Sequence, residues 1–590
     1  MTTKPGEPRT PVPYPLVIGS VILFVAALLL PLDSIATLPQ GSSATLPQSS
    51  SQNEEESNVG LPVEHAATVS NCVRCHAMDD AGRMTRISYE RKTPEGWQQT
   101  IRRMVLLNDV ELEPEVARDI VRYLANEHGL APEEARPGFF EAERRVIDFD
   151  YEDDDTEVLC IQCHSMGRVI TQRRTRVEWE LLVAMHRGYY PLVDTQGNPG
   201  FRRRGPPSSD DDGPPDSRHP MDKAIAHLAA TYPLETDEWT AWSANRRTPR
   251  LAGRWALAGH SAFSGPVYGF VDVTPVGGSE GEFTTVTTVT SALASRATTT
   301  RTGSAIVYTG FQWRGRSTDP GEGDSMREVM FIERDWRRMS GRWFTGAYDE
   351  IGIDVTLYRA DGPLVTGVYP AALRAGTEMQ ELTVYGINLP TDVEPADIDF
   401  GPHVIVTEIL EADAHAIRLR ASVAADAAIG KRDLFVGAAA RPDALVVFDT
   451  VDAVRVTPQA GMARLGGVVA PKQFAQFEAI GVSNGPDGEP GTADDLDLGA
   501  VDVTWSLEEY SATFDDDDID FVGELGADGL FTPALDGPNP ERSGDRNNVG
   551  DVWVVATYQS DELGRPLRGR AHLIVTVPLY LNMRGWEPGR

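Results

Sequence analysis

The chain has 590 residues, more than one hydrophobic core usually organises, so it is expected to fold as several domains. Its formal net charge of -34 argues against nucleic acid as a partner, because a phosphate backbone is bound by clustered Lys and Arg side chains. All four cysteines lie in two short motifs, CVRCH at 72–76 and CIQCH at 160–164, so none is left for a structural disulfide.

The first 61 residues are typical of an export signal followed by a linker. Lys4 and Arg9 precede an apolar run over 16–32, as the charged and hydrophobic regions of a signal peptide do. The run is long for a signal and short for a membrane span, so 1–36 is either a signal peptide cleaved near Ala36 or an N-terminal membrane anchor. Residues 37–61 are rich in Ser, Gln, Asn and Glu and are expected to be a flexible linker. The chain is therefore expected to be exported to the periplasm, either free or tethered to the inner membrane.

The remaining residues divide by composition into a helical part and a strand-rich part. Residues 62–248 show helical spacing, contain both cysteine motifs and are predicted to form one α-helical domain. After Arg250, short runs of Val, Thr, Tyr and Phe alternate with Gly, Pro and Asp, which predicts strands and turns. Breaks near 361–363 and 456–458 divide this part into β-domains at 249–362, 363–455 and 456–590. The predicted fold class is multidomain α plus all-β, with three antiparallel domains of the barrel or sandwich type.

The two CxxCH motifs indicate covalent attachment of haem c. Two thiols three positions apart can add to both vinyl groups of one haem, and the adjacent histidine then lies against the iron. The predicted thioether residues are Cys72, Cys75, Cys160 and Cys163. The predicted proximal iron ligands are His76 and His164. A zinc site built from two CxxC pairs is the alternative, but 88 positions separate the pairs, and both histidines would be left without a role.

A sequence repeat offers a sixth ligand for each iron. Thr93 is predicted to cap a helix that begins at the following proline, and the segment 175–186 repeats the pattern of 93–104. Met104 lies seven residues after Trp97, and His186 lies seven residues after Trp179. The two residues therefore occupy the same face of the equivalent helix in each repeat. Each is a competent ligand for haem iron. The alternatives are Met78 or Met84 in the first repeat, and Met185 or His219 in the second.

Several other features have more than one interpretation. The second repeat is longer by about 23 residues, mostly at 193–220, and this insertion is either a passive solvated loop or a cover for a haem edge or partner. Arg173, Arg174 and Arg176 either steer an acidic redox partner, pair with haem propionates or are simply solvated. His128, just before a glycine, is predicted to be a helix-end cation. Four aspartates within 487–497 form either an acidic turn or a calcium site.

These residues together resemble one known family, the haem-bearing alpha subunit of quinohemoprotein amine dehydrogenase. The resemblance lies in the tandem haem motifs with matching tryptophan-to-ligand helices and in GVYPAALRAGTEMQELTVYGINLP at 367–390. It also lies in ARLGGVVAPKQFAQFEAIGVSNGPDGEPGTADDLDLG at 463–499 and in GLFTPALDGPNPERSGDRNNVGDVWVVATY at 529–558. It extends over about 62–582 and is looser between Gly253 and Asp361.

The resemblance implies an amine-oxidising oxidoreductase in which this chain transfers electrons. A small partner subunit would carry a cysteine tryptophylquinone that deaminates a primary amine to an aldehyde and ammonia. A β-propeller subunit would complete a heterotrimer, and electrons would cross two covalently bound haem c groups to a soluble copper protein or cytochrome c. By position, His76 and His164 would be the proximal ligands, and Met104 and His186 the distal ones. No catalytic residue is expected on this chain, and the last two β-domains are expected to be immunoglobulin-like.

The alternative function is a membrane-tethered dihaem c-type cytochrome whose β-domains are a scaffold or adhesion module and whose electron donor is unrelated. The N-terminal apolar run favours such tethering and departs from a freely soluble periplasmic complex. A zinc-stabilised exported binding protein is a third interpretation, and it predicts no Soret band.

Overall fold

The computed structural model describes residues 59–138, 151–160, 166–189, 193, 218–293, 297–321, 323, 325–345, 351–467, 470–511 and 517–578. Contacts divide the chain into two units, 1–52 and 53–590, and every element described below lies in the second unit. The predicted signal or anchor at 1–36 and most of the predicted linker lie outside the described residues. Within the described ranges, no helix is both long and apolar enough to cross a membrane.

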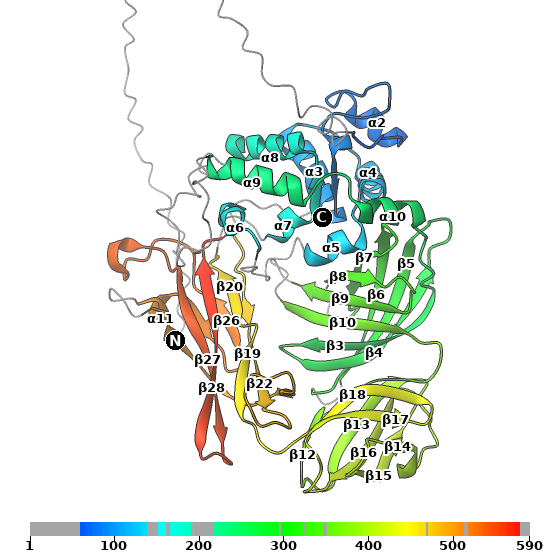
Figure 1. The fold of residues 1–590 in the computed structure, drawn as a ribbon, viewed down its shortest axis with the longest axis vertical. Coiled ribbons are helices and arrows are strands. Elements are labelled where there is room, and N and C mark those ends of the chain that lie inside the picture. The colour runs from blue at the N-terminus through cyan, green and yellow to red at the C-terminus, as the bar shows by residue number, and fades with distance from the viewer. Residues whose placement is uncertain are drawn as a thin grey trace, which may run out of the picture. The chain divides into compact units, whose positions relative to one another are not determined.

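The helical part consists of two repeats of the same plan (Figure 1). The first contains α2 (Ala66–Cys72), α3 (Pro94–Leu107) and α4 (Pro114–Glu127), and the second contains α6 (Asp154–Cys160), α8 (Arg176–Tyr189) and α9 (Pro220–Thr231). Short helices complete it: η1 (Ile87–Tyr89), α5 (Pro132–Ala135), η2 (Arg136–Gly138), α7 (Gly167–Ile170) and α10 (Asp237–Asn245). The predicted start of α3 is confirmed, because Thr93 Oγ1 accepts the N–H of Gly96 at 3.2 Å and Pro94 is the first helical residue.

Each repeat is organised around a fully buried tryptophan. Trp97 packs with Ile101 of α3 and Ile120 of α4, and Trp179 packs with Val183 of α8 and Ile225 of α9. These residues recur at three- and four-residue spacing, which gives each helix one apolar stripe towards its own core. The apolar stripes of these helices therefore form two small cores, one in each repeat, and not a single core.

A two-stranded ribbon joins the repeats. Its strands, β1 (Glu90–Lys92) and β2 (Gln172–Arg174), are antiparallel, with Glu90 opposite Arg174, Arg91 opposite Arg173 and Lys92 opposite Gln172. The sequences ERK and QRR contain no apolar residue, so hydrophobic periodicity gives no signal for these strands.

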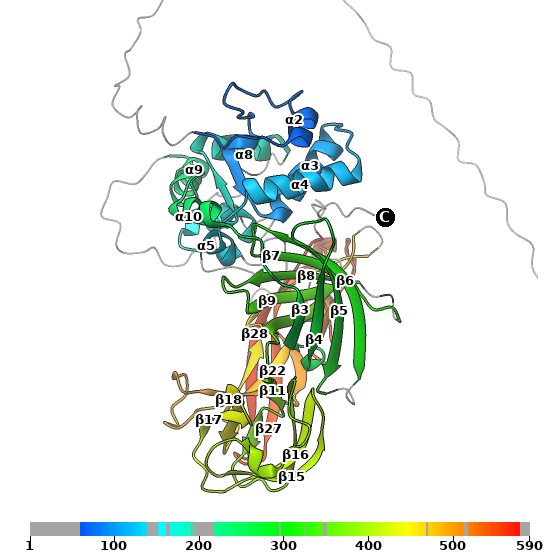
Figure 2. The same ribbon diagram turned by 90° about the vertical axis from the view of Figure 1, so that its right-hand side faces the viewer.

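The third part is a closed eight-stranded barrel, one of the two architectures expected (Figure 2). Neighbouring strands follow the chain, and β10 closes the barrel against β3. The interior contains Trp255, Trp313 and Trp343, each about 1% exposed or less. The strands are β3 (Gly253–Ser261), β4 (Gly265–Pro275), β5 (Glu282–Ser291), β6 (Thr298–Tyr308), β7 (Gln312–Thr318), β8 (Ser325–Ile332), β9 (Arg338–Thr345) and β10 (Ile351–Arg359).

The next sheets enclose a single core. One sheet has the order β11 (Leu364–Tyr369), β13 (Gln380–Ile387), β16 (Ala416–Val423) and β15 (Val404–Ala412). The other has the order β12 (Ala372–Arg374), β18 (Ala439–Phe448), β17 (Gly430–Val436) and β14 (Ile398–Asp399), and η4 (Pro395–Asp397) precedes β14. Val384 and Leu419 of the first sheet and Leu445 of the second lie in the same buried cluster. Two sheets facing across one core form a sandwich.

The last part has three sheets around another core, which contains Phe477, Val554 and Leu573. The four-stranded sheet has the order β20 (Ala460–Arg464), β28 (Arg565–Thr576), β27 (Gly550–Ser560) and β24 (Thr504–Glu509). The three-stranded sheets are β19 (Ala453–Thr457), β22 (Glu478–Ser483) and β23 (Leu496–Ala500), and β21 (Ala475–Gln476), β26 (Leu530–Pro533) and β25 (Gly523–Leu525). Two short helices, α11 (Asp518–Phe521) and η5 (Ser543–Asp545), accompany them.

The prediction of purely antiparallel sheets is wrong in these last two parts. β12 pairs in parallel with β18, and β20 pairs in parallel with β28. Each follows a proline, Pro370 after β11 and Pro458 after β19, and proline has no N–H with which to continue a ladder. The chain therefore leaves one sheet at the proline and enters another, where it pairs in parallel. The immunoglobulin-like assignment stays a prediction.

Candidate functional site

The first cysteine motif is a tight turn at the end of a helix. α2 ends at Cys72, whose carbonyl accepts the N–H of Cys75 at 3.1 Å and the N–H of His76 at 2.9 Å. Both cysteines are free thiols, Cys72 half-buried and Cys75 exposed. Burial, together with the neighbouring Cys75, raises the pKa of Cys72, so this group is a protonated thiol at neutral pH.

The ring of His76 is already oriented for ligation. Its Nδ1 lies 2.8 Å from the carbonyl oxygen of Thr85, which can only accept a hydrogen bond. Nδ1 therefore carries the proton, and Nε2 of the neutral ring carries the lone pair that binds a metal. The loop between His76 and Thr85 is closed by a second hydrogen bond, in which the N–H of Thr85 donates to the carbonyl of Ala77 at 2.9 Å. Two thiols and one preset imidazole match the donor set that haem c attachment requires.

The three methionines that could be the distal ligand of the first repeat lie in different surroundings. Met84 is 0% exposed and packs in the core with Trp97, whereas Met78 is 42% exposed. Met104 is partly exposed on α3, and Asn108 Nδ2 lies 3.9 Å from its sulfur. Met84 therefore has a structural role in the core, and Met104 stays the predicted distal ligand.

The second motif is described only in part. Cys160 ends α6 as Cys72 ends α2, and burial raises the pKa of Cys160 to about 12. Cys163 and His164 lie outside the described residues, as does most of the insertion at 193–220. Their assignment to the second haem stays a prediction.

His186 has the form of a neutral ligand. Its Nδ1 lies 2.8 Å from the carbonyl of Leu182, so this nitrogen carries the proton and Nε2 has the lone pair. Burial lowers the pKa of His186, and this favours the neutral ring. The two alternative ligands have other partners. His219 caps α9, where its Nδ1 accepts the N–H of Met221 at 3.1 Å, and the sulfur of Met185 accepts from Arg103 Nη1 at 3.6 Å.

The two repeats place the same groups around their tryptophans. Trp97 Nε1 donates to the carbonyl of His128 at 2.9 Å, and Trp179 Nε1 donates to the carbonyl of Tyr232 at 3.3 Å. Lys92 Nζ lies 4.9 Å from the ring centre of Trp97, and the guanidinium carbon of Arg174 lies 5.7 Å from that of Trp179. These cations are 82 positions apart in sequence, as are the two tryptophans and the two predicted distal ligands.

One side of the ribbon between the repeats is a buried ion cluster. Lys92 Nζ lies 2.8 Å from Glu90 Oε1, and Arg174 pairs with the same carboxylate. Arg86 Nε, in the first repeat, lies 2.7 Å from Glu178 Oε2 in the second. Burial raises the pKa of Glu90, but Arg174 and Lys92 outweigh it and hold that pKa at about 2. Burial lowers the pKa of Lys92 to about 7, although Glu90 opposes this shift.

The other side of the ribbon centres on Glu134. Arg91 donates two hydrogen bonds to its carboxylate, one to each oxygen and both at 2.8 Å, which makes a bidentate ion pair. Arg173 Nε lies 3.1 Å from Oε1 of the same carboxylate. Thr236 Oγ1 and the N–H of Ala131 also donate to it, at 2.7 and 2.8 Å. This carboxylate therefore links α5, both strands of the ribbon and the start of α10.

One of the alternatives given for Arg173 and Arg174 is wrong, and so is the prediction for His128. Arg173 and Arg174 are 7% and 2% exposed and ion-paired, so they do not steer a partner, whereas Arg176 is exposed and pairs with Glu180 at 3.3 Å. His128 is 0% exposed, and burial lowers its pKa to about 4, so it is a neutral core residue and not a helix-end cation. Sequence reasoning missed the ribbon charges because it places Arg and Lys at the surface.

The acidic segment at 487–497 forms hydrogen-bonded turns. Asp494 accepts from Thr492 Oγ1 at 2.7 Å and from the N–H of Asp487 at 3.1 Å, and Asp495 accepts from Gly491 at 2.9 Å. Asp497 pairs with Arg455 at 2.8 Å. Over the described ranges, no group of three or more His, Cys, Asp or Glu side chains is arranged to hold a metal ion.

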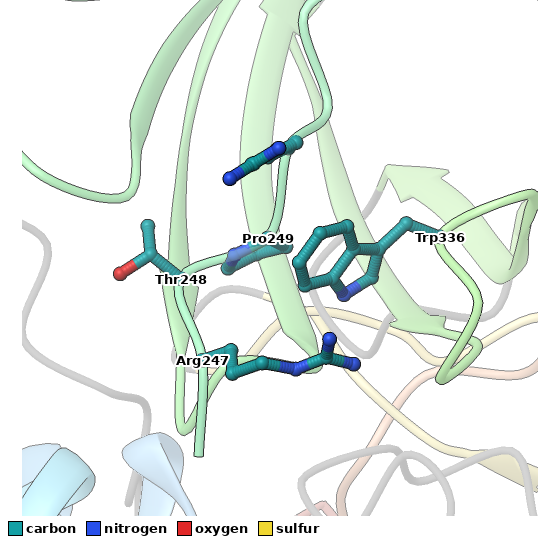
Figure 3. A pocket seen from close by; sticks show the side chains of 5 residues that line it. Arg247, Thr248, Pro249 and Trp336 are labelled. Carbon is teal, nitrogen blue, oxygen red and sulfur yellow. The ribbon is translucent and has the colours of Figure 1, made fainter. Parts of the chain in front are cut away.

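A separate cavity of about 650 Å³ lies at the start of the barrel (Figure 3). Its lining consists of Arg247, Thr248, Pro249, Arg250 and Trp336. The guanidinium of Arg247 lies 4.7 Å from the ring centre of Trp336. None of the predicted thioether or iron-ligand residues lines this cavity.

Four family models match the chain. The model described as quinohemoprotein amine dehydrogenase A, alpha subunit, haem binding, matches 64–203 and so includes both cysteine motifs and both predicted distal ligands. Models of domains II, III and IV of the quinohemoprotein amine dehydrogenase alpha subunit match 248–360, 362–449 and 454–584. No curated protein matches the chain.

Several solved structures resemble parts of the chain. A redesigned β barrel bound to DFHBI is 20% identical, with 18% of this chain and 94% of that one covered and a TM-score of 0.16. Another redesigned β barrel is 14% identical, with 19% and 92% covered and a TM-score of 0.17. Cadherin-like domains 1 to 4 of zebrafish RET are 10% identical, with 44% and 62% covered and a TM-score of 0.15.

Proposed function

Because the chain belongs to the family of quinohemoprotein amine dehydrogenase alpha subunits, we propose that it is the haem-bearing electron-transfer subunit of such an enzyme. Electrons would come from a cysteine tryptophylquinone on a small partner subunit, where a primary amine is oxidised. A β-propeller subunit would complete the complex, and a soluble copper protein or cytochrome c would take the electrons.

The preset His76 ring in a CxxCH turn carries this proposal. Cys72 and Cys75 would hold one haem through thioether bonds, and His76 would bind its iron through Nε2, which the bond from Nδ1 to the Thr85 carbonyl leaves as the ligating nitrogen. When bound, such a haem supplies an iron that accepts and releases one electron. Met104 would be the distal ligand of this site.

The second site would differ in its distal ligand. Cys160 and Cys163 would be the thioether residues, His164 the proximal ligand and His186 the distal one. A thioether favours ferrous iron more than an imidazole does, so Met104 would give its site the higher potential. The chain itself would supply no acid or base for amine chemistry. Its roles would be to bind two haems and to set their reduction potentials.

Export to the periplasm is part of the same proposal. Thioether attachment and the N-terminal charge and apolar pattern both fit an exported protein, either soluble or tethered by residues 1–36. If the tether persists, the Ser- and Gln-rich residues that follow it would be the spacer.

The test is the visible spectrum of the natively purified oxidised complex before and after a primary amine is added. The expected result is prompt appearance of reduced c-type bands with a primary amine and no change with a tertiary amine. Absence of a c-type Soret band would contradict the haem assignment. Bands that dithionite reduces but amine does not, with the small subunit still present, would favour the tethered cytochrome with another donor.

A further inference from the structure

The end of β6 in the barrel packs into the core of the first helical repeat. Tyr308, the last residue of β6, is 7% exposed and belongs to the same buried cluster as Trp97. Ile306 of β6 packs against this cluster, and so does Cys72, a predicted thioether residue. A side chain of the barrel and a residue predicted to hold haem therefore share one core.

Hydrogen bonds from two helices fix the turn that follows β6. The N–H of Thr309 donates to Asn126 Oδ1 on α4 at 2.7 Å, and Trp242 Nε1 on α10 donates to the carbonyl of Thr309 at 2.9 Å. Thr309 is 0% exposed and has a φ of 50°, in the left-handed region that a β-branched residue rarely adopts. Such a conformation persists where the surrounding contacts determine it. The contacts with α4 and α10 therefore hold the turn in place against the helical part.

An ion pair joins β7 of the barrel to α3. Arg314 contacts both carboxylate oxygens of Glu95, and its Nη2 lies 3.2 Å from Oε2. The two side chains are 15% and 11% exposed, so salt screens this pair less than it screens a surface pair. Glu95 lies in the first turn of α3, which also carries Trp97 and Met104. The barrel therefore contacts the helix of the predicted distal ligand directly.

The second repeat differs at the matching positions. The position 82 residues after Glu95 is Val177, which is 50% exposed. The buried cluster around Trp179, as far as the described residues show it, takes its members from 151–232 and none from the barrel. Within the described part of the chain, a barrel side chain thus completes the core around Trp97 but not the core around Trp179.

We infer that Tyr308 and Arg314 are positioning residues for the first haem site, through which the barrel maintains the reduction potential of that site and not of the second. The inference rests on the proposed function, in which Cys72 holds the first haem and Met104 is its distal ligand. Tyr308 supports the core that α2 and α3 share, and Arg314 holds the first turn of α3. If α3 shifts, Met104 moves with it, and a weaker bond from its sulfur to iron lowers the reduction potential.

The experiment is a potentiometric titration of the natively purified complex, in which the visible spectrum follows each haem. The first haem is identified as the one whose absorption bands Cys72→Ser shifts. Tyr308→Ala is expected to lower the midpoint potential of the first haem by the equivalent of a roughly tenfold change in its reduction equilibrium, about 59 mV for one electron. It should also weaken the sulfur-to-iron charge-transfer band and leave the second haem unchanged. Tyr308→Phe, which keeps the ring in the core, is expected to retain both the potential and the band.

Substitutions at the ion pair separate positioning from a direct effect of charge. Arg314→Met removes a positive charge and Glu95→Gln removes a negative one, so their direct electrostatic effects on the first haem have opposite signs. A positioning role predicts instead that both lower the first potential, because each leaves the other group partly buried without its partner. The double variant Glu95→Gln/Arg314→Met leaves no unpaired charge and is expected to recover most of the potential. The matched control is Arg254→Met, which removes an arginine paired with Asp272 within the barrel and should leave both potentials unchanged.

Three outcomes would overturn the inference: a first-haem potential in Tyr308→Ala and Arg314→Met equal to that of Arg254→Met, opposite shifts in Arg314→Met and Glu95→Gln, or equal shifts of both haems. The ion-pair variants decide the question if Tyr308→Ala does not fold. Absent haems, or haems that amine does not reduce in the unmutated complex, would contradict the proposed function instead. Two amine-reducible haems whose potentials do not depend on Tyr308 or Arg314 would contradict this inference alone.

Discussion

Replacement of Glu134 by glutamine should loosen the junction between the two helical repeats. The glutamine keeps the shape of the carboxylate but removes the charge that neutralises Arg91 and Arg173, whose side chains are 0% and 9% exposed. A buried ion pair that loses one partner costs about 3–5 kcal/mol, because the remaining charge stays buried without compensation. At 1.36 kcal/mol per factor of ten, this cost corresponds to an opening equilibrium about 150 to 5,000 times more favourable.

The assay is native-state hydrogen exchange of the backbone amides around the ribbon, which reports local opening without assuming that a multidomain chain unfolds in one step. The useful reporters are the N–H of Lys92, bound to the His128 carbonyl at 3.0 Å, and the N–H of Arg174, bound to the Tyr232 carbonyl at 3.2 Å. Glu115→Gln is the control, since its exposed ion pair should be worth at most about 1 kcal/mol. Exchange in Glu134→Gln within about threefold of the wild type corresponds to less than about 1 kcal/mol and would show that Glu134 does not hold the junction together.

Three other substitutions test the distal ligand, the thioether bond and the buried ion cluster. Met104→His should abolish the sulfur-to-iron charge-transfer band of the oxidised protein and lower the potential of that haem, and an unchanged band would show that another methionine is the ligand. Cys72→Ser should leave one vinyl group of the first haem unreacted, which a pyridine haemochrome spectrum detects as a band at longer wavelength; an unchanged spectrum would exclude a thioether at this position. Glu90→Gln should weaken the acid sensitivity of the helical domain. The pKa of Glu90 is lowered in the folded chain from 4.5 to about 2, so the wild type should lose about 3 kcal/mol as the pH falls from 4.5 to 2, and equally steep acid unfolding of the variant would contradict this.

Hydrophobic spacing and duplication made much of the helical part predictable. The cap at Thr93 and the buried faces of α3 and α8 follow from residues that recur at three- and four-residue intervals around Trp97 and Trp179. The strand-rich composition after Arg250 likewise predicted sheets, but it did not decide between a barrel and a sandwich. That choice depends on whether β10 reaches β3, a pairing between segments about 100 residues apart that local patterns do not encode.

The ribbon and its charges could not be predicted by the same means. Glu90, Lys92 and Arg174 are buried because each finds an opposite charge on the other repeat, and that partner is unknown until the fold is formed. One signal was available in the sequence, because Lys92 and Arg174 occupy equivalent positions five residues before Trp97 and Trp179. A cation retained at the same place in two repeats suggests a structural role, which the contacts with the tryptophan rings show.

If two haems on this chain receive the electrons of amine oxidation, a stoichiometric titration should detect both of them. The natively purified oxidised complex is titrated anaerobically with a primary amine while haem content, chain concentration and the reduced c-type bands are measured. Oxidation of a primary amine to an aldehyde releases two electrons, and each haem accepts one. Two haems per chain are expected, and both should be reduced when amine is in excess. One haem per chain, or two haems that amine leaves oxidised while dithionite reduces them, would contradict this expectation.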